Sequence, residues 1–68
     1  MEWIPVTKQI PEDFERVLIW WVTRETNEGN YGFGYQVDDV WYGDGAGMSR
    51  VVLAWMPLPA KYEGGTNA

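Results

Sequence analysis

The sequence predicts an all-β or mainly β protein, folded as a small, strongly bent antiparallel sheet of about five strands. Short apolar or alternating segments of strand length recur along its 68 residues, and polar, glycine-containing or proline-containing turns separate them. The closing apolar segment ends abruptly at two prolines. The one stretch that has signals for the start of a helix leaves no room for a full helix.

The closing segment, residues 51–59, is the strand around which the rest of the chain is organised. Its β-branched and aromatic residues favour an extended backbone, and about six residues is an ordinary strand length. Pro57 and Pro59 argue against a helix, because each lacks an amide donor and biases the residue before it away from helical angles. We therefore expect a strand that ends near Trp55 or Met56 and is covered on both faces.

We expect the segments before residue 51 to pack against the closing strand. Residues 3–6 predict a short edge strand, since an edge tolerates their proline. Residues 11–14 could form a single helical turn, because proline suits the first helical position and acids suit the positive end of the helix dipole. Residues 16–23 are apolar on both faces and predict a central strand. In the polar connection that follows, Gly29-Asn30 suits the positive φ angles of a hairpin loop.

The segment 31–37 alternates between aromatic or apolar residues on one face and small or polar residues on the other. Gly32 and Gly34 fall on the second face. One interpretation is that a large ring such as Trp20 or Trp21 lies across these glycines, and it is the one we favour. The other is close approach of a ligand or a second subunit.

The last elements are short. Asp38-Asp39 predicts a tight turn, residues 40–42 begin another strand, and residues 43–50 predict a flexible loop that leads to the closing strand. The five strands together predict a single small β domain over residues 1–60, either a bent sheet or an SH3-like half-open barrel. Residues 61–68 are polar and contain glycine, and we expect a flexible C-terminal tail.

Charge and residue types exclude several classes of function. The formal net charge is −5, from ten acidic and five basic residues, and the scattered basic residues offer no surface for duplex nucleic acid. The absence of cysteine and histidine excludes disulfides, thiolate zinc ligands and the commonest general base. No apolar run approaches the about 18 residues of a membrane span, and the N-terminus lacks the regions of a secretory signal. We expect a cytosolic protein.

The candidates for catalytic and metal-binding residues each lack part of the motif that their chemistry requires. The loop 43–50 has the glycine content of a phosphate-binding loop, but it lacks the Lys-Ser/Thr ending of a P-loop. Ser49 has no base evident in the sequence. Three turn acids fail the spacing of a calcium loop, namely Asp38, Asp39 and Asp44. We assign no catalytic residue, no metal and no cofactor.

The aromatic residues favour binding. Five Trp, four Tyr and two Phe exceed what so small an interior can hold, and surface rings are enriched at interfaces and pockets. Trp20 and Trp21 must face opposite sides of one strand, so one of them lies outside the core. A stacking platform with arginines for phosphate would use Trp20, Trp21, Tyr31, Tyr35, Trp41, Arg24 and Arg50. The competing interpretation is that these rings bury one another or a subunit interface.

Short motifs mark the start, the second strand and the end of the chain. They are Trp3-Ile4-x-Val6, Ile10-Pro11 followed after a gap by Val17-Leu18, and Trp55-Met56-Pro57-Leu58-Pro59, with a middle rich in Tyr and Trp. Together they resemble DUF551, a family of small proteins of unknown function found in phages and prophages. The Trp-Met-Pro-Leu-Pro ending is the most specific part. Members often carry His before that Trp, where this chain has Ala54.

The resemblance implies a phage accessory protein in the cytoplasm of a bacterial host, and it brings no catalytic residues. Because small phage accessory proteins often antagonise host defences, we expect a non-enzymatic binding protein that sequesters a nucleotide-derived signal of antiviral defence. We expect a homo-oligomer that forms the pocket. The alternative is an acidic inhibitor that blocks a host protein directly, its charge steering it to a basic surface. A hydrolase acting on a small nucleotide is a third interpretation.

Overall fold

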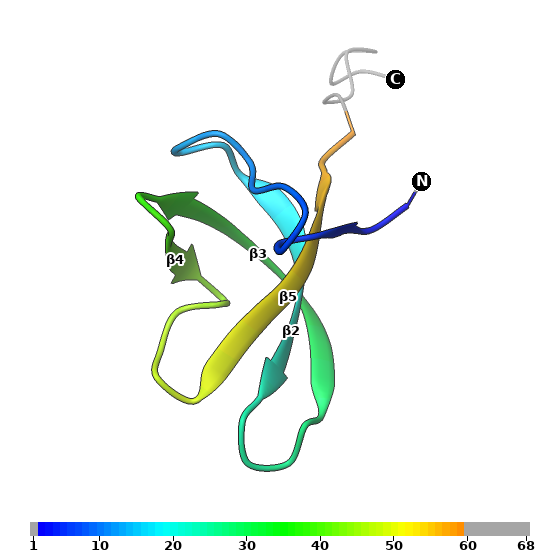
Figure 1. Ribbon diagram of the computed structural model, residues 1–68, viewed down its shortest axis with the longest axis vertical. Coiled ribbons are helices and arrows are strands. Elements are labelled where there is room, and N and C mark those ends of the chain that lie inside the picture. The colour runs from blue at the N-terminus through cyan, green and yellow to red at the C-terminus, as the bar shows by residue number, and fades with distance from the viewer. Residues whose placement is uncertain (1, 60–68) are drawn as a thin grey trace, which may run out of the picture.

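A computed structural model describes residues 2–59 as one antiparallel sheet of five strands that is not closed into a barrel (Figure 1). The strands, in chain order, are β1 (Ile4–Pro5), β2 (Val17–Thr23), β3 (Gly29–Val37), β4 (Val40–Gly43) and β5 (Arg50–Pro57). No helix occurs in this part of the chain, and none therefore has the length and apolar character that crossing a membrane requires. The predicted all-β fold is confirmed, whereas the predicted tail lies outside the described residues.

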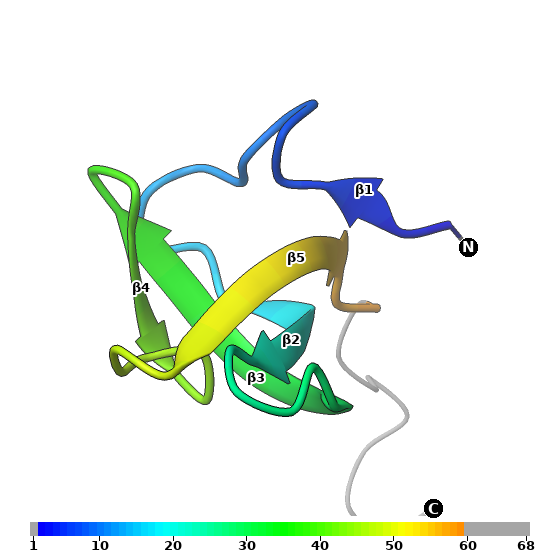
Figure 2. The same ribbon diagram turned by 60° about the horizontal axis from the view of Figure 1, so that its bottom comes forward.

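The spatial order β1-β5-β2-β3-β4 confirms two predictions about strand position. β1 lies at an edge of the sheet, where its Pro5 is exposed and the missing amide costs no ladder hydrogen bond. β2 lies in the middle, between β5 and β3, and pairs with both. The sheet is strongly twisted, and β3 and β5 cross at a steep angle on the two sides of β2 (Figure 2).

The prediction that β5 is covered on both faces is wrong. Val52 and Trp55 are buried, but Leu53 is 45% exposed. In the pairing of β2 with β5 the register shifts, so that Leu53 has no partner on β2 and forms a bulge. A single sheet has only one face turned to its own core, which is why the apolar side chains of β5 divide between inside and outside. The strand ends at Pro57, one residue beyond the predicted end.

The core is small and lies on one face of β2 and β5. Four buried side chains form it, namely Val17, Ile19, Val52 and Trp55, and four half-buried ones pack against them, namely Ile4, Val6, Trp21 and Trp41. The indole Nε1 of Trp55 donates to the backbone carbonyl of Gln9 at 2.9 Å, so the largest core ring also holds the loop after β1.

The loop between β4 and β5 closes over this core. A Cβ atom on Gly45 would lie 2.5 Å from Val52 Cγ2 and 3.0 Å from Ile19 Cδ1, so only glycine fits this close approach. The loop was predicted to be flexible, yet hydrogen bonds from backbone amides fix both of its ends. The amide of Asp44 donates to Phe33 O at 3.0 Å, and that of Arg24 donates to Ser49 O at 2.8 Å.

Two local predictions about turns are wrong and one is confirmed. Residues 11–14 form no helical turn, because Phe14 has a φ of 67°, outside the right-handed helical region. Gly29 and Asn30 belong to β3, and the positive φ before that strand falls on Asn27 instead. The turn at Asp38-Asp39 is confirmed, since both residues have positive φ, as the two-residue hairpin loop between β3 and β4 requires.

β3 alternates as predicted, and its small residues face inward. Gly32 and Gly34 are buried, whereas Tyr31 and Phe33 are exposed. The predicted ring reaches Gly32 only in part: its Cβ position is 3.0 Å from the indole Nε1 of Trp21, but 2.6 Å from Asp44 Cβ. At Gly34 no ring lies against the strand, since the nearest atom is the backbone oxygen of Tyr42 at 2.5 Å. The ring of Trp20 lies against Gly29 instead.

Gln36 is the buried polar residue of the described chain, only 1% exposed, and its amide joins three segments. Its Nε2 donates to Pro11 O at 2.5 Å and to Asp13 Oδ1 at 2.9 Å. Its Oε1 accepts from the amide of Asp39 at 3.0 Å. The long connection between β1 and β2 is thereby fastened to the turn between β3 and β4, and every polar atom of the side chain is satisfied.

This network predicts the effect of replacing Gln36 by leucine, which keeps the volume and removes all three hydrogen bonds. We expect Gln36→Leu to lower the free energy of unfolding by about 2–3 kcal/mol, because Pro11 O and the amide of Asp39 lose their partner. Urea denaturation followed by tryptophan fluorescence measures it. Gln9→Leu is the matched control, since its side chain is exposed, and we expect a change within about 0.5 kcal/mol. Equal unfolding midpoints for the two variants would contradict the role given to Gln36.

Candidate functional site

The seven residues predicted for binding lie in three places, not on one platform. Trp20 and Tyr31 meet on the outer face of the sheet, which is the face opposite the core. Tyr35 belongs to a second ring cluster near β4. Trp21, Trp41, Arg24 and Arg50 lie around the loop between β4 and β5.

The first place is a cluster of three rings. Trp20 and Tyr31 lie edge to face, with centroids 5.0 Å apart and planes at 75°, because they are paired across β2 and β3. Trp3, which was not predicted, joins them at 6.4 Å from Trp20 and 6.2 Å from Tyr31. These rings and Ala54 line a cavity of about 340 Å³. Its lining offers no charged group.

The second place is a stack around Tyr35. Its ring lies 5.3 Å from that of Tyr42, its partner on β4, and 6.0 Å from that of Phe14. Neither Phe14 nor Tyr42 was predicted. The predicted tight turn at Asp38-Asp39 is the signal that could have found Tyr42, because a two-residue loop pairs Val37 with Val40 and therefore Tyr35 with Tyr42.

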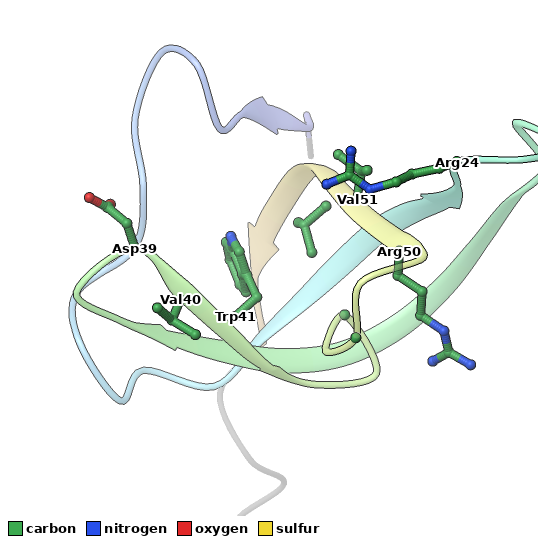
Figure 3. Close-up of a pocket in the computed structure, with 9 residues that line it drawn as sticks. Arg24, Asp39, Val40, Trp41, Arg50 and Val51 are labelled. Carbon is green, nitrogen blue, oxygen red and sulfur yellow. The ribbon is translucent and has the colours of Figure 1, made fainter.

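The third place is a cavity of about 360 Å³ at the rim of the core, and it combines charge with a ring (Figure 3). Its lining comes from the end of β2, from β4, from the following loop and from β5: Arg24, Asp39, Val40, Trp41, Gly45, Gly47, Arg50, Val51 and Val52. Three predicted residues meet here, namely Arg24, Trp41 and Arg50.

Both arginines are held by backbone carbonyls. Arg24 Nε donates to Met48 O at 2.8 Å, and Arg50 Nη1 donates to Asp44 O at 2.7 Å. The guanidinium of Arg50 also lies 4.3 Å from the ring centroid of Trp21, a cation–π geometry. A carbonyl carries no net charge, so each arginine keeps its positive charge and its remaining N–H donors while its position is fixed.

The two arginines differ in direction. In Figure 3 Arg24 reaches across Val51 toward Trp41, whereas the guanidinium of Arg50 points away from Trp41 on the far side of the loop. Asp39 stands at the opposite end of the cavity. Arg24 and Trp41 therefore form the central pair, and Arg50 holds the loop and extends the positive surface.

This lining can bind but supplies few groups for catalysis. Its functional groups are two guanidiniums, one indole and the single carboxylate of Asp39, and none of these four is a nucleophile of the hydroxyl or thiol type. Guanidiniums bind phosphate or carboxylate through paired N–H donors, and an indole face stacks on a planar ring. The arrangement suits a small anion that carries an aromatic ring.

Comparison with known proteins places the chain in a family. The model of a family described as "Protein of unknown function (DUF551)" matches residues 2–61, nearly the whole chain. No curated protein and no solved structure matches the chain.

The contacts of Arg50 predict that it stabilises the loop and the adjoining core. We expect Arg50→Met to lower the free energy of unfolding by about 1–2 kcal/mol, because the variant loses the cation–π contact and the hydrogen bond to Asp44 O. Arg16→Met is the control: it removes the same charge, from a guanidinium that lies 5.5 Å from the exposed ring of Phe33. For it we expect a loss of about 0.5 kcal/mol or less in denaturant unfolding. A loss as large in Arg16→Met as in Arg50→Met would refute the specific role of Arg50.

Proposed function

We propose a function for this chain from the premise that it belongs to the DUF551 family, whose description assigns no activity. The chain is a non-enzymatic binding protein, and its ligand is a small nucleotide-derived molecule. The observation that carries this proposal is that Arg24 and Trp41 face the same cavity at the rim of the core.

The two residues match the two parts of a nucleotide. Stacking of one base on an aromatic ring contributes about 1–3 kcal/mol in proteins that bind single strands, and Trp41 offers such a ring. The guanidinium of Arg24 offers N–H donors to a phosphate, and its bond to Met48 O holds it in place before the ligand arrives. Less conformational entropy is lost when a side chain is already ordered. The volume of about 360 Å³ lies within the range of small-molecule sites.

The overall charge of −5 opposes an anionic ligand, and among the lining residues Asp39 is the acidic one. Interactions between exposed charges fall off within a Debye length of about 8 Å at physiological ionic strength. At the cavity, Arg24 faces Trp41 and Arg50 adds positive charge on the far side of the loop, against the one carboxylate of Asp39 in the lining. The local field therefore favours a phosphate between Arg24 and the loop.

Sequestration suits this site better than turnover does. A protein that removes a signal by binding needs affinity and abundance, and no catalytic group is required. The resemblance of the chain to small phage and prophage proteins supports a role against bacterial antiviral defence, in the cytoplasm of the host. The ligand is then a nucleotide-derived signal that the defence system makes.

The second candidate function is direct inhibition of a host protein. The surplus of acidic residues and the large exposed apolar side chains, such as Met48 at 93% and Phe14 at 73%, support it. Acidic charge would steer the protein toward a basic partner surface. A pull-down from host lysate separates the two candidates, because one stoichiometric partner that is released by salt supports inhibition, whereas a co-purified nucleotide supports sequestration.

The nucleotide proposal is tested by calorimetry with a panel of mononucleotides, cyclic mononucleotides and cyclic dinucleotides. We expect one class to bind, and Arg24→Gln to weaken its binding at least about tenfold, because a hydrogen bond to a charged group is lost. Arg16→Gln is the matched control, since this arginine lies over the ring of Phe33 and does not line the cavity. We expect the Arg16→Gln variant to bind the nucleotide with the affinity of the wild type.

Two results would sink the proposal: no uptake of any compound in the panel, or equal weakening by Arg24→Gln and Arg16→Gln. Chromatography of the incubated ligand distinguishes binding from hydrolysis. The ligand is expected to be recovered unchanged. Turnover that is lost in Asp38→Asn or Asp44→Asn variants would point to a hydrolase instead.

A further inference from the structure

The outer face of the sheet carries both ring clusters, with Phe33 between Tyr31 and Tyr35 on β3, and we call these residues the aromatic face. It consists of Trp3, Trp20, Tyr31, Phe33, Tyr35 and Tyr42. The three β3 residues among them are two positions apart, so they point to the same side of the strand. Trp20 pairs with Tyr31 across β2, and Tyr42 pairs with Tyr35 across β4, so the row extends over neighbouring strands.

This face is the size of the largest apolar patches on monomeric proteins, which are often functional. Tyr31 is 70% exposed, Phe33 46%, Tyr42 43% and Trp3 37%. At about 150–250 Å² for each aromatic residue, these four with the half-buried Trp20 and Tyr35 leave on the order of 500 Å² of residue surface in water. The largest apolar patch on a typical monomer is about 300–600 Å² and is often functional. Among the ten described aromatic residues, Trp55 alone is buried.

The composition of the aromatic face is that of an interface core. Interface cores are enriched in Tyr, Trp, Phe and Arg and depleted in acidic residues. Leu18, which pairs with Phe33, and Val37, two positions after Tyr35, add apolar side chains and no charge to the same face. The cation beside them is Arg16, whose guanidinium lies over the ring of Phe33 at 5.5 Å. Two such faces could meet without bringing carboxylates together at their centre.

The small size of the core indicates that the aromatic face packs against a second layer. Five hydrophobic side chains are buried in the described part of the chain, namely Val17, Ile19, Val22, Val52 and Trp55. Domains are ordinarily built from two packed layers, and a chain of this length buries only about 60% of its unfolded surface. Within residues 2–59 the single sheet therefore has no second layer on its outer side. A second copy of the same sheet, packed about 10 Å away, would supply it.

We propose that the aromatic face is a homodimer interface, on which a second copy of this chain docks face to face. The contact is isologous, so each copy places the same rings against its partner. The area of about 500 Å² is smaller than the about 800 Å² per partner of a standard interface, which suits a dimer that dissociates on dilution. The cavity of Arg24 and Trp41 opens on the core side, so the dimer carries two open cavities and the proposal stands independently of the ligand.

Single-stranded nucleic acid is the rival occupant, because bases also stack on exposed rings. The charge disfavours it: such proteins surround their rings with a positive groove, and here Arg16 stands beside the face in a chain of net charge −5. A second copy of the chain needs no such groove.

Sedimentation velocity of the full chain, over a range up to about 200 μM, tests the proposal. We expect a dimer that dissociates on dilution. Tyr31→Glu places two like charges in the interface and should weaken dimerisation at least about tenfold. Met48→Glu is the control, since it makes the same charge change at a residue that is 93% exposed on the loop between β4 and β5, and it should dimerise like the wild type. Phe33→Gln, a neutral variant on the same face, should also weaken the dimer.

Circular dichroism of each variant shows whether the sheet is retained. A wild type that stays monomeric at about 200 μM overturns the proposal, and so do Tyr31→Glu and Met48→Glu variants that dimerise equally. Fluorescence anisotropy with a labelled oligothymidine tests the rival. Tight binding that Tyr31→Glu abolishes would assign the aromatic face to single-stranded nucleic acid and overturn the homodimer.

Discussion

The structure depends on one constraint: a single small sheet must enclose its own core. β2 and β5 supply the buried side chains, and the loop after β4 returns over them. That return is possible only because Gly45 has no side chain where the loop touches Val52 and Ile19. The glycines on the inner face of β3 leave room in the same way for Trp21 and for the end of β4. Packing of backbone against side chain here replaces the second layer that larger domains use.

The same constraint separates the two faces of the sheet. The inner face is crowded, and where the core ends it forms a cavity with one indole and fixed positive charge. The outer face has no layer over it in the described chain and keeps its rings in water. The buried amide of Gln36 fastens the long connection before β2 to the turn between β3 and β4.

Hydrogen bonds between the arginines and the loop after β4 fix the positive groups at the cavity. Arg24 and Arg50 bind carbonyls of the loop between β4 and β5, and the loop in turn is held by the amides of Asp44 and Arg24. The arginines thus order the loop and remain charged. A loop that the sequence marks only as rich in glycine becomes one wall of a defined site, since long-range hydrogen bonds restrict the freedom that glycine would otherwise give it.

The sequence by itself determined the class of fold, the central place of residues 17–23, the edge strand with its proline and the tight turn at Asp38-Asp39. These follow from periodicity and turn chemistry, which are local. It also determined that more rings are present than the interior can hold. Of the seven predicted binding residues, however, only Arg24, Trp41 and Arg50 line the cavity at the rim of the core.

Only the tertiary structure decided which face of each strand is inside, where the bulge at Leu53 falls, and that the end of β2 meets β4 at a cavity. β2 and β5 are apolar on both faces, so alternation could not choose the buried one. The choice is made by strand register and by the bend of the sheet, and both depend on contacts between residues far apart in the chain. A local pattern contains no information about such contacts.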